Sequence, residues 1–413
     1  MITTINNKHK KLNVPNLRFP EFQGEWEKQK LCDISTIVGR IGFRGYTTND
    51  IVEKGMGAIA LSPTNIVNNQ LTYDKDNTYI SMSKYEESPE IMIKRGDVIF
   101  VKTGSTVGKV AYVDKLICKT TLNPQVVVLK DIKCDNYILS VIMSTRKFQN
   151  KIQRITVGGA VPTLSQVAMG NIFISLPAAE EQEKISKFIS LLDERIATQN
   201  KIIEDLKKLK CAIIEKVLNG NHCANLRLGD VGSYIRGLTY SSNDVVENNG
   251  TLVMRSNNIV NGSPLDYKGD VVSVNKQISQ EQQLQDGDIV ICMANGSSAL
   301  VGKSSFYDGK CTSPITVGAF CGIYRSKMPI TKWLFQTNRY RRYIWNSLQG
   351  GNGAIANLNG EDILRMQFPV PDEQTAERWT KILSSLASLI ESNVSLCSKY
   401  SQQKEYLLRQ MFI

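Results

Sequence analysis

The two halves of the sequence resemble each other, and this duplication constrains the fold more than any other feature. The run Asn65-Ile-Val-Asn68 recurs identically as Asn258-Ile-Val-Asn261. Four further pairs follow the same order with offsets of about 190 to 197 residues: 30–35 with 227–232, 94–100 with 285–291, 104–109 with 296–303, and 176–182 with 370–374. An ordered series of matches indicates an internal repeat, so one supersecondary arrangement is expected twice.

Each half divides into a globular segment and a long helix. Short β-branched runs such as Asp97–Val101 and Asp288–Cys292 lie between Gly, Asn, Asp and Ser, which is typical of strands and turns. We predict an α+β fold with two similar, β-rich globular domains, each followed by a long helix of a coiled coil. The predicted boundaries are an N-terminal arm (1–25), a first domain (26–178), a first spacer helix (179–219), a second domain (220–371) and a second spacer helix (372–413).

Both helical segments lack internal Pro and Gly, and their apolar residues alternate at steps of four and three, the period of a coiled-coil seam. Polar residues interrupt the two seams at equivalent places, Gln199 with Asn393 and Lys210 with Lys404. Two helices that each pack on their own globular domain remain an alternative. The predicted seam contains Ile185, Ile189, Leu192, Ile196, Leu206, Trp379, Leu383, Leu386, Ile390 and Leu407.

The charge of the chain indicates where a polyanion would bind. The formal net charge is +11. Residues 180–216 contain eight acids and eight bases, and residues 372–409 contain five of each. Because both helices are neutral, the excess lies in the globular segments and the N-terminal arm, where Lys and Arg can contact phosphates.

Several catalytic classes do not fit. A P-loop needs four residues between Gly and Gly-Lys, but Gly104 and Gly108 enclose three and Gly296 and Gly302 enclose five. Asn123-Pro-Gln-Val126 lacks the second proline and the aromatic residue of an amino-methyltransferase motif. We therefore assign no catalytic residue to this chain.

Metal binding and membrane insertion are not expected either. The nine cysteines form no CxxC, and the pair His222-Cys223 has no further ligands at zinc spacing. No apolar run could span a bilayer, and the N-terminus does not read as a secretory signal. We expect a cytoplasmic protein.

Side chains that read bases or contact phosphates gather in glycine-bent loops and basic clusters of both halves. The Gly-Lys loops fit an ordinary hairpin turn equally well. The first-half candidates are Arg40, Arg44, Tyr46, Lys102, Thr103, Ser105, Thr106, Lys109 and Arg154. The second-half candidates are Arg236, Tyr240, Arg255, Asn257, Asn295, Ser297, Ser298, Lys303, Arg339, Arg341 and Arg342.

This organisation resembles the specificity subunit of type I restriction–modification systems over nearly the whole chain. The motifs that carry the resemblance are Asn-Leu-Arg-Phe-Pro (16–20), Gly-Asp-Val-Ile (96–99), Gly-Ser-x-x-Gly-Lys (104–109), Leu-Pro-x-x-x-Glu-Gln (176–182) and the helix 185–217. The second half departs in detail, because its Gly-Ser loop is longer and Asp372-Glu-Gln374 directly follows the proline.

The resemblance implies that each globular segment is a target-recognition domain that reads one half of a bipartite duplex DNA site. It also implies that the two long helices pack as an antiparallel coiled coil, which separates the domains and sets the spacing. It further implies two modification subunits, which would bind S-adenosylmethionine and methylate adenine. A motor–endonuclease subunit would add ATP- and Mg-dependent cleavage. No cofactor is expected in this chain itself.

Two rival functions remain open. A DNA-modifying enzyme with an unrecognised active site would bind a cofactor or methylate DNA without partners. A scaffold that binds proteins through its helices would give no site-specific footprint on DNA.

Overall fold

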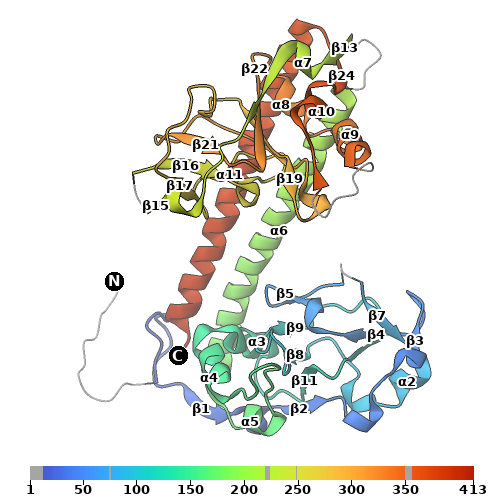
Figure 1. Ribbon diagram of the computed structural model, residues 1–413. Coiled ribbons are helices and arrows are strands. Elements are labelled where there is room, and N and C mark those ends of the chain that lie inside the picture. The colour runs from blue at the N-terminus through green and yellow to red at the C-terminus, as the bar shows by residue number, and fades with distance from the viewer. Residues whose placement is uncertain (1–12, 74–75, 219–223, 248, 349–355) are drawn as a thin grey trace. The chain divides into compact units, whose positions relative to one another are not determined.

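The computed structural model describes residues 13–73, 76–218, 224–247, 249–348 and 356–413 (Figure 1). They belong to two compact units: unit 1 is Met1–Ala197 with Ser398–Ile413, and unit 2 is Thr198–Cys397. His222 and Cys223 lie outside the described residues. None of the helices in the described ranges has the length and apolarity that crossing a membrane requires.

Unit 1 contains two main sheets. The larger has the order β2-β11-β8-β9-β6-β5, and its central strands β8 and β11 are buried on both faces almost throughout. Its strands are β2 (Thr36–Gly39), β11 (Val126–Lys130), β8 (Val98–Val101), β9 (Val110–Tyr112), β6 (Gln70–Leu71) and β5 (Ile66–Val67). The smaller sheet consists of β10 (Thr120–Leu122), β4 (Ala58–Leu61), β7 (Thr78–Ile80) and β3 (Ile51–Val52), and the strands β1 (Glu27–Lys30) and β12 (Phe173–Leu176) form a separate pair.

Unit 2 has two four-stranded sheets and two strand pairs. The first sheet has the order β14 (Gly232–Arg236), β22 (Cys321–Ser326), β18 (Ile289–Cys292), β20 (Ser304–Phe306). The second has the order β21 (Ile315–Val317), β16 (Thr251–Met254), β17 (Val272–Val274), β15 (Val245–Val246). The pairs are β13 (Ala224–Arg227) with β24 (Gln367–Val370), and β19 (Ala294–Asn295) with β23 (Ala356–Asn357).

The two units share one topology. Strands β2-β11-β8-β9 correspond to β14-β22-β18-β20, and β10-β4-β7-β3 correspond to β21-β16-β17-β15. In both four-stranded sheets the equivalent pair, β10–β4 or β16–β21, is the parallel one. Unit 1 differs by the added hairpin β5–β6. The predicted α+β class and internal repeat are confirmed.

The identical Asn-Ile-Val-Asn runs owe their recurrence to a shared turn. The side-chain oxygen of Asn65 accepts the backbone N–H of Ser62 at 2.9 Å, and Asn258 accepts that of Arg255 at 2.9 Å. Both asparagines are buried and donate onward to backbone carbonyls of Thr72 or Asp266. Buried polar groups need hydrogen-bond partners. Each asparagine side chain supplies them to backbone groups of its turn, which an apolar side chain could not do.

Short helices recur in equivalent places as well. Those of unit 1 are α1 (Leu31–Ile34), α2 (Met82–Glu86), α3 (Asn136–Ser144), α4 (Arg146–Ile155) and α5 (Gln166–Gly170). Those of unit 2 are α7 (Leu228–Val231), α8 (Thr331–Leu334), α9 (Asn338–Leu348) and α10 (Gly360–Leu364).

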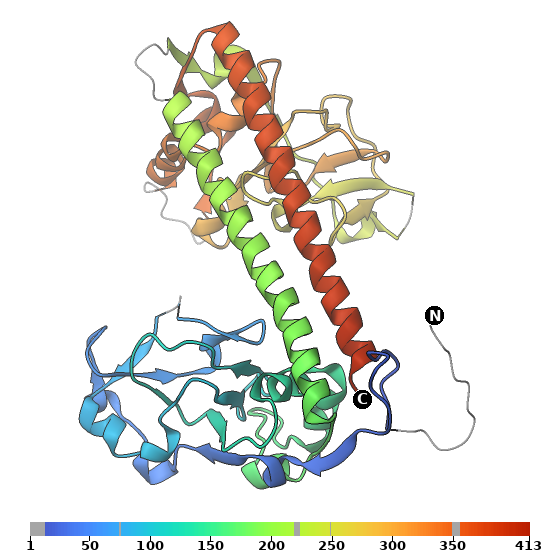
Figure 2. The same cartoon turned by 180° about the vertical axis from the view of Figure 1, so that it is seen from behind.

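The long helices are α6 (Ala179–Val217) and α11 (Glu373–Met411), each 39 residues. Within each unit, the parts of α6 and α11 that belong to it pack antiparallel (Figure 2). In unit 1 the Arg195 guanidinium lies 4.5 Å from the Tyr400 ring centroid, and Lys404 pairs with Asp193. In unit 2 the amide of Gln199 donates to the side-chain oxygen of Asn393 at 2.5 Å. The two polar residues that interrupt the seams at this place are therefore hydrogen-bonded to each other.

Burial along the helices follows the predicted spacing. None of the seam positions is exposed, and Ile189 and Leu383 are fully buried. Near the end of α6 the predicted four-and-three spacing falls on Ile213 and Val217. The most buried side chains there are instead Ile214 and Leu218, because they pack into the globular core of unit 2. Lys210 donates to the carbonyl of Gly262 at 2.9 Å.

Residues 13–26 fasten the ends of both long helices in unit 1. The Arg18 guanidinium forms two hydrogen bonds with the buried Glu181 carboxylate, at 2.7 and 2.6 Å. The Leu17 N–H donates to the carbonyl of Gln410. Trp26 packs against Phe412 with ring centroids 6.0 Å apart. This segment therefore joins the beginning of α6 to the end of α11.

Candidate nucleic-acid interface

Both Gly-Lys segments are hairpin connections, β8 to β9 in unit 1 and β18 to β20 in unit 2 (Figure 1). The Gly108 N–H donates to Val101 at 3.0 Å, and the Gly302 N–H donates to Cys292 at 2.8 Å. The two glycines have φ of +101° and +79°, a backbone region that other residues rarely adopt. The hairpin alternative is therefore the observed geometry, and it presents Ser105, Ser297 and Ser298 to solvent.

Each hairpin loop packs on a helix that carries basic residues. The Gln149 amide of α4 donates to the Gly108 carbonyl at 2.8 Å, and the Tyr340 hydroxyl of α9 donates to the Gly302 carbonyl at 2.9 Å. A Cβ at position 108 would come within 2.2 Å of Gln149 Oε1, and one at position 302 within 2.7 Å of Ile344. Glycine is thus required twice, for its φ and for the close approach of the helix.

The N-termini of α4 and α9 show which helix positions are equivalent. Thr145 accepts the Phe148 N–H and donates to the Ile142 carbonyl. Thr337 accepts the Tyr340 N–H and donates to the Leu334 carbonyl. These side-chain caps satisfy otherwise unpaired helix amides. With Thr145 matched to Thr337, position 149 corresponds to 341 and position 153 to 345.

In unit 2 the loop and helix α9 enclose a cavity of about 490 Å³. It brings together three predicted residues, Ser298, Lys303 and Arg341. Trp345, four residues after Arg341 on the same face of the helix, also lines it. The sequence did not single out Trp345, because nothing local distinguishes an exposed tryptophan from a core one.

The arginine cluster of α9 is divided between two faces. Arg339 and Arg342 line a separate cavity of about 240 Å³ with Tyr343 and Asn346. Only Arg341 faces the Gly-Lys loop. Arg341 and Arg342 are exposed, and in the described part of the chain neither pairs with a carboxylate.

The predicted residues around the Gly-Lys loop of unit 1 are less available for contact with DNA. The Lys109 ammonium donates to the Ile66 carbonyl at 3.2 Å, and Lys102, Thr103 and Thr106 are half-buried. Thr103 pairs with Thr163, which places the exposed segment 157–161 beside the loop. Arg154 is exposed at the end of α4.

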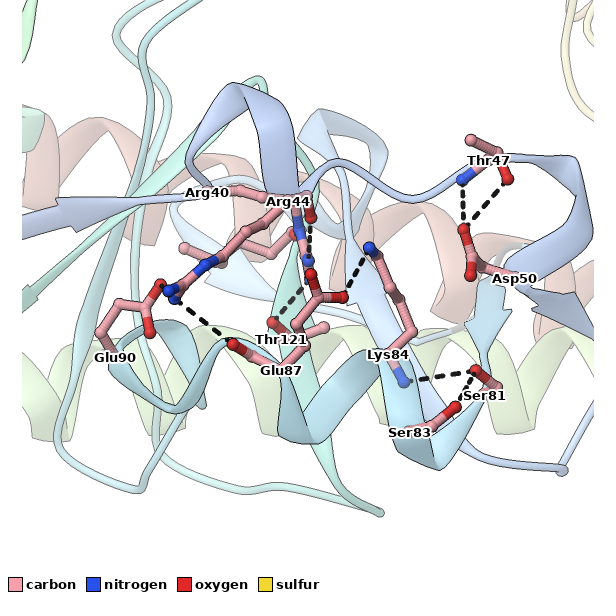
Figure 3. A network of polar contacts seen from close by, with 11 residues as sticks. Arg40, Arg44, Thr47, Asp50, Ser81, Ser83, Lys84, Glu87, Glu90 and Thr121 are labelled. Carbon is pink, nitrogen blue, oxygen red and sulfur yellow. Dashed lines mark hydrogen bonds and ion pairs between the residues drawn. The ribbon is translucent and has the colours of Figure 1, made fainter.

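The loop at residues 40–46 contains Arg40, Arg44 and Tyr46, which the sequence predicts to contact DNA, but Arg40 is buried (Figure 3). Arg40 is only 4% exposed, and its guanidinium donates to the Leu122 carbonyl at 2.9 Å and to Thr121 at 3.1 Å. Burial lowers the pKa of Arg40, and half-buried Tyr46 lies 5.5 Å from its guanidinium. Arg40 therefore supports the end of β10, and its predicted contact with DNA, which stays a prediction, would have to break these hydrogen bonds.

Arg44 is partly exposed, but its charge has nearby acceptors. Its guanidinium lies 3.7 Å from the Glu90 carboxylate and 3.4 Å from the Glu87 carbonyl (Figure 3). An already paired cation gains less from a phosphate than a free one. Arg44 is thus a weaker candidate than Arg154.

Three second-half candidates likewise have hydrogen-bond partners within the protein. The Arg255 guanidinium and the Asn257 amide both reach Asp270, at 2.9 and 3.2 Å. Asn295 donates to Ser256 at 3.3 Å and accepts the Ser297 N–H. Tyr240 is half-buried, whereas Arg236 is exposed. The side chains left most available in unit 2 are Arg236, Ser298, Arg341 and Arg342.

Comparison with known proteins now places this arrangement. The family model for the type I restriction modification DNA specificity domain matches residues 23–208. The chain is therefore similar to type I restriction–modification specificity subunits. The MjaVIII specificity subunit of Methanocaldococcus jannaschii is 30% identical over 128 residues, which cover 31% of this chain and 29% of the relative. The EcoKI specificity subunit of Escherichia coli is 29% identical over 170 residues, which cover 39% of this chain and 35% of the relative.

These matches span well under two thirds of the length of the specificity subunits concerned. The crystal structure of a type I restriction–modification S subunit from M. genitalium covers 97% of this chain and 99% of its own, with a TM-score of 0.59 and 14% identity. At that identity the likeness extends to the fold. The sequence match covers residues 23–208, and the likeness of fold to the solved structure extends over both units.

Within the described ranges, no cluster of three or more His, Cys, Asp or Glu side chains could hold a metal ion. The raised pKa of Cys321, about 12 through burial, also disfavours a thiolate there. The exposed candidate residues described above offer hydrogen bonding and positive charge.

Proposed function

We propose that this chain supplies DNA-sequence recognition to a type I restriction–modification complex and performs no catalysis itself. One observation carries the proposal: both units build the same hairpin loop on the same basic helix, yet place different side chains there. Gln149 and Gln153 stand in unit 1 where Arg341 and Trp345 stand in unit 2. Identical scaffolds with different surface residues suit two readers of two unlike half-sites in duplex DNA.

Paired readers also fit the energetics of recognition. A single mismatched base pair costs ~1–3 kcal/mol, so one small domain discriminates poorly. Two domains on one chain add their discrimination and raise the effective concentration of the second contact. A bipartite site follows from this arrangement.

The long helices offer a docking surface for partner subunits. In unit 2, Ile202 and Leu209 on α6 are exposed, and so are Ile382, Leu389 and Leu396 on α11. Their spacing of seven residues keeps each set on one side of its helix. Each of these residues directly precedes a buried residue of the helix pair, and in an antiparallel pair this common offset places both rows on the same face. The buried residues are Ile203, Lys210, Leu383, Ile390 and Cys397.

We propose that apolar helices of a modification subunit cover this face, because heptad-spaced apolar rows suit helix-on-helix packing. S-adenosylmethionine would be bound by that partner, and ATP and Mg by a motor–endonuclease subunit. The double variant I202D/L209D should lose copurification with the modification subunit. The matched control K207D, on an exposed position of α6, should retain it.

Mapping methylated adenines in cells with and without this chain tests the main proposal. We expect a bipartite motif to appear only when the chain is present. Methylation by the purified chain alone would contradict it and favour a DNA-modifying enzyme. Copurification of partners without any site-specific footprint would contradict it in favour of a scaffold.

A further inference from the structure

Trp345 is the feature of unit 2 that the recognition scaffold leaves unexplained. Its side chain is 67% exposed on α9, although it is a large aromatic group and the nearby residues Tyr340 and Ile344 of the same helix are buried. The position equivalent to Trp345 in unit 1 is Gln153, by the matched threonine caps. An exposed tryptophan is therefore a property of one reader and not of the shared fold.

The surroundings of Trp345 combine an apolar floor with a cationic rim. Val301, Phe335 and Ile344 line the adjoining cavity and are buried. Lys303 and Arg341 stand at the same cavity, and no carboxylate is among its described lining residues. A cavity of unit 1, about 680 Å³, is instead lined by Asp114, Asp193 and Glu194 together with two lysines.

We propose that Trp345 packs its ring against the sugars and bases of the half-site that unit 2 reads, as an aromatic anchor. Arg341 holds the neighbouring phosphate, and Ser298 lines the same cavity. This inference rests on the proposed function, and it adds a specificity-determining residue. The charge around Trp345 favours DNA over a protein partner, since an indole ring flanked by cations matches the apolar and anionic surfaces that a duplex presents together.

An apolar contact and a phosphate contact differ in their dependence on salt. Trp345 carries no charge, so the W345A variant should weaken specific binding about tenfold or more without changing the slope of log K against log salt. The R341A variant should lower that slope by about one, the value for one phosphate contact. The W345F variant should retain most of the affinity, because it keeps a flat ring.

The experiment uses the complex with its partner subunits and a duplex that carries its mapped methylation motif. Binding is measured between low and moderate salt for the wild type, W345A, W345F and R341A. F173A removes an exposed aromatic ring of unit 1 and serves as the matched control, which should bind like the wild type. Thermal melting checks that each variant is folded.

Tryptophan fluorescence reports the contact directly. Trp26 and Trp333 are buried and Trp379 is half-buried, so acrylamide should quench mainly Trp345. We expect the cognate duplex to protect this emission and W345F to abolish the effect. Wild-type affinity in W345A, or protection by partner subunits without DNA, would overturn the inference while leaving the proposed function intact. Absence of site-specific binding by the wild-type complex would instead overturn both.

Discussion

Arg40 and Arg341 carry the same side chain in opposite environments. Both lie in clusters that the sequence indicates as DNA contacts, but Arg40 is buried against Leu122 and Thr121, whereas Arg341 is exposed beside the Gly-Lys loop. A guanidinium that already donates to backbone carbonyls inside a domain would have to give up these hydrogen bonds to reach a phosphate. At the scale of single residues, availability decides function more than residue type does.

The Arg18–Glu181 pair should be among the most sensitive single positions in unit 1. Glu181 is fully buried, and R18A would leave its carboxylate without the guanidinium that forms two hydrogen bonds with it. Removing one partner of a buried ion pair costs about 3–5 kcal/mol. We expect a loss of this size in the free energy of unfolding from chemical denaturation. The control R154A removes an exposed arginine and should change stability little; equal losses in both would contradict a special role for the pair.

Two equivalent aspartates should give the protein an acid-dependent stability. The Thr47 amide holds the pKa of Asp50 below its usual 3.8, and the Ser241 amide does the same for Asp244. A lowered folded-state pKa means a contribution that is complete above the unfolded value of about 3.8 and is lost as the pH falls through the folded value. The double variant D50N/D244N should therefore lose less stability than the wild type between about pH 4 and the lower folded pKa. The denaturation midpoint measured against pH checks this, and parallel curves would argue against it.

Helix α6 is held in unit 1 by the regular spacing of its buried residues. Along the first turns of α6 the buried and exposed sides alternate within a few residues, from fully buried Ile189 to Leu191, which is 54% exposed. Ile189 belongs to the core of unit 1, together with Trp26, Leu176 and Phe412. The element as a whole is therefore stabilised through one face and is open to partners through another.

A matched pair of substitutions tests this division. I189D would place an unpaired carboxylate in the core and should destabilise unit 1 by about 4 kcal/mol or more. L191D, two residues away on the exposed side, should change the free energy of unfolding by less than about 1 kcal/mol. Equal effects in thermal and chemical denaturation would show that the seam is wrongly placed.

At the scale of the whole molecule, the duplicated topology makes the two recognition units interchangeable in principle. Each has its own hydrophobic cores and its own loop-on-helix surface. We predict that replacing residues 26–177 with the corresponding segment of another specificity subunit changes one half of the methylated motif and leaves the other half intact. Mapping methylated adenines reads out the result. A change in both halves would show that the units do not read independently.

The sequence alone determined the duplication, the α+β class and the two long helices, because repeats and helical periods are local patterns that survive without knowledge of contacts. It also pointed to the Gly-Lys loops, since a left-handed glycine next to a strand is encoded locally. The tertiary structure decided which cations remain free. Arg40 meets Leu122 and Arg255 meets Asp270 only after folding, and the exposure of Trp345 depends on where α9 packs. Such pairings join residues distant in the chain, and for that reason no spacing in the sequence could reveal them.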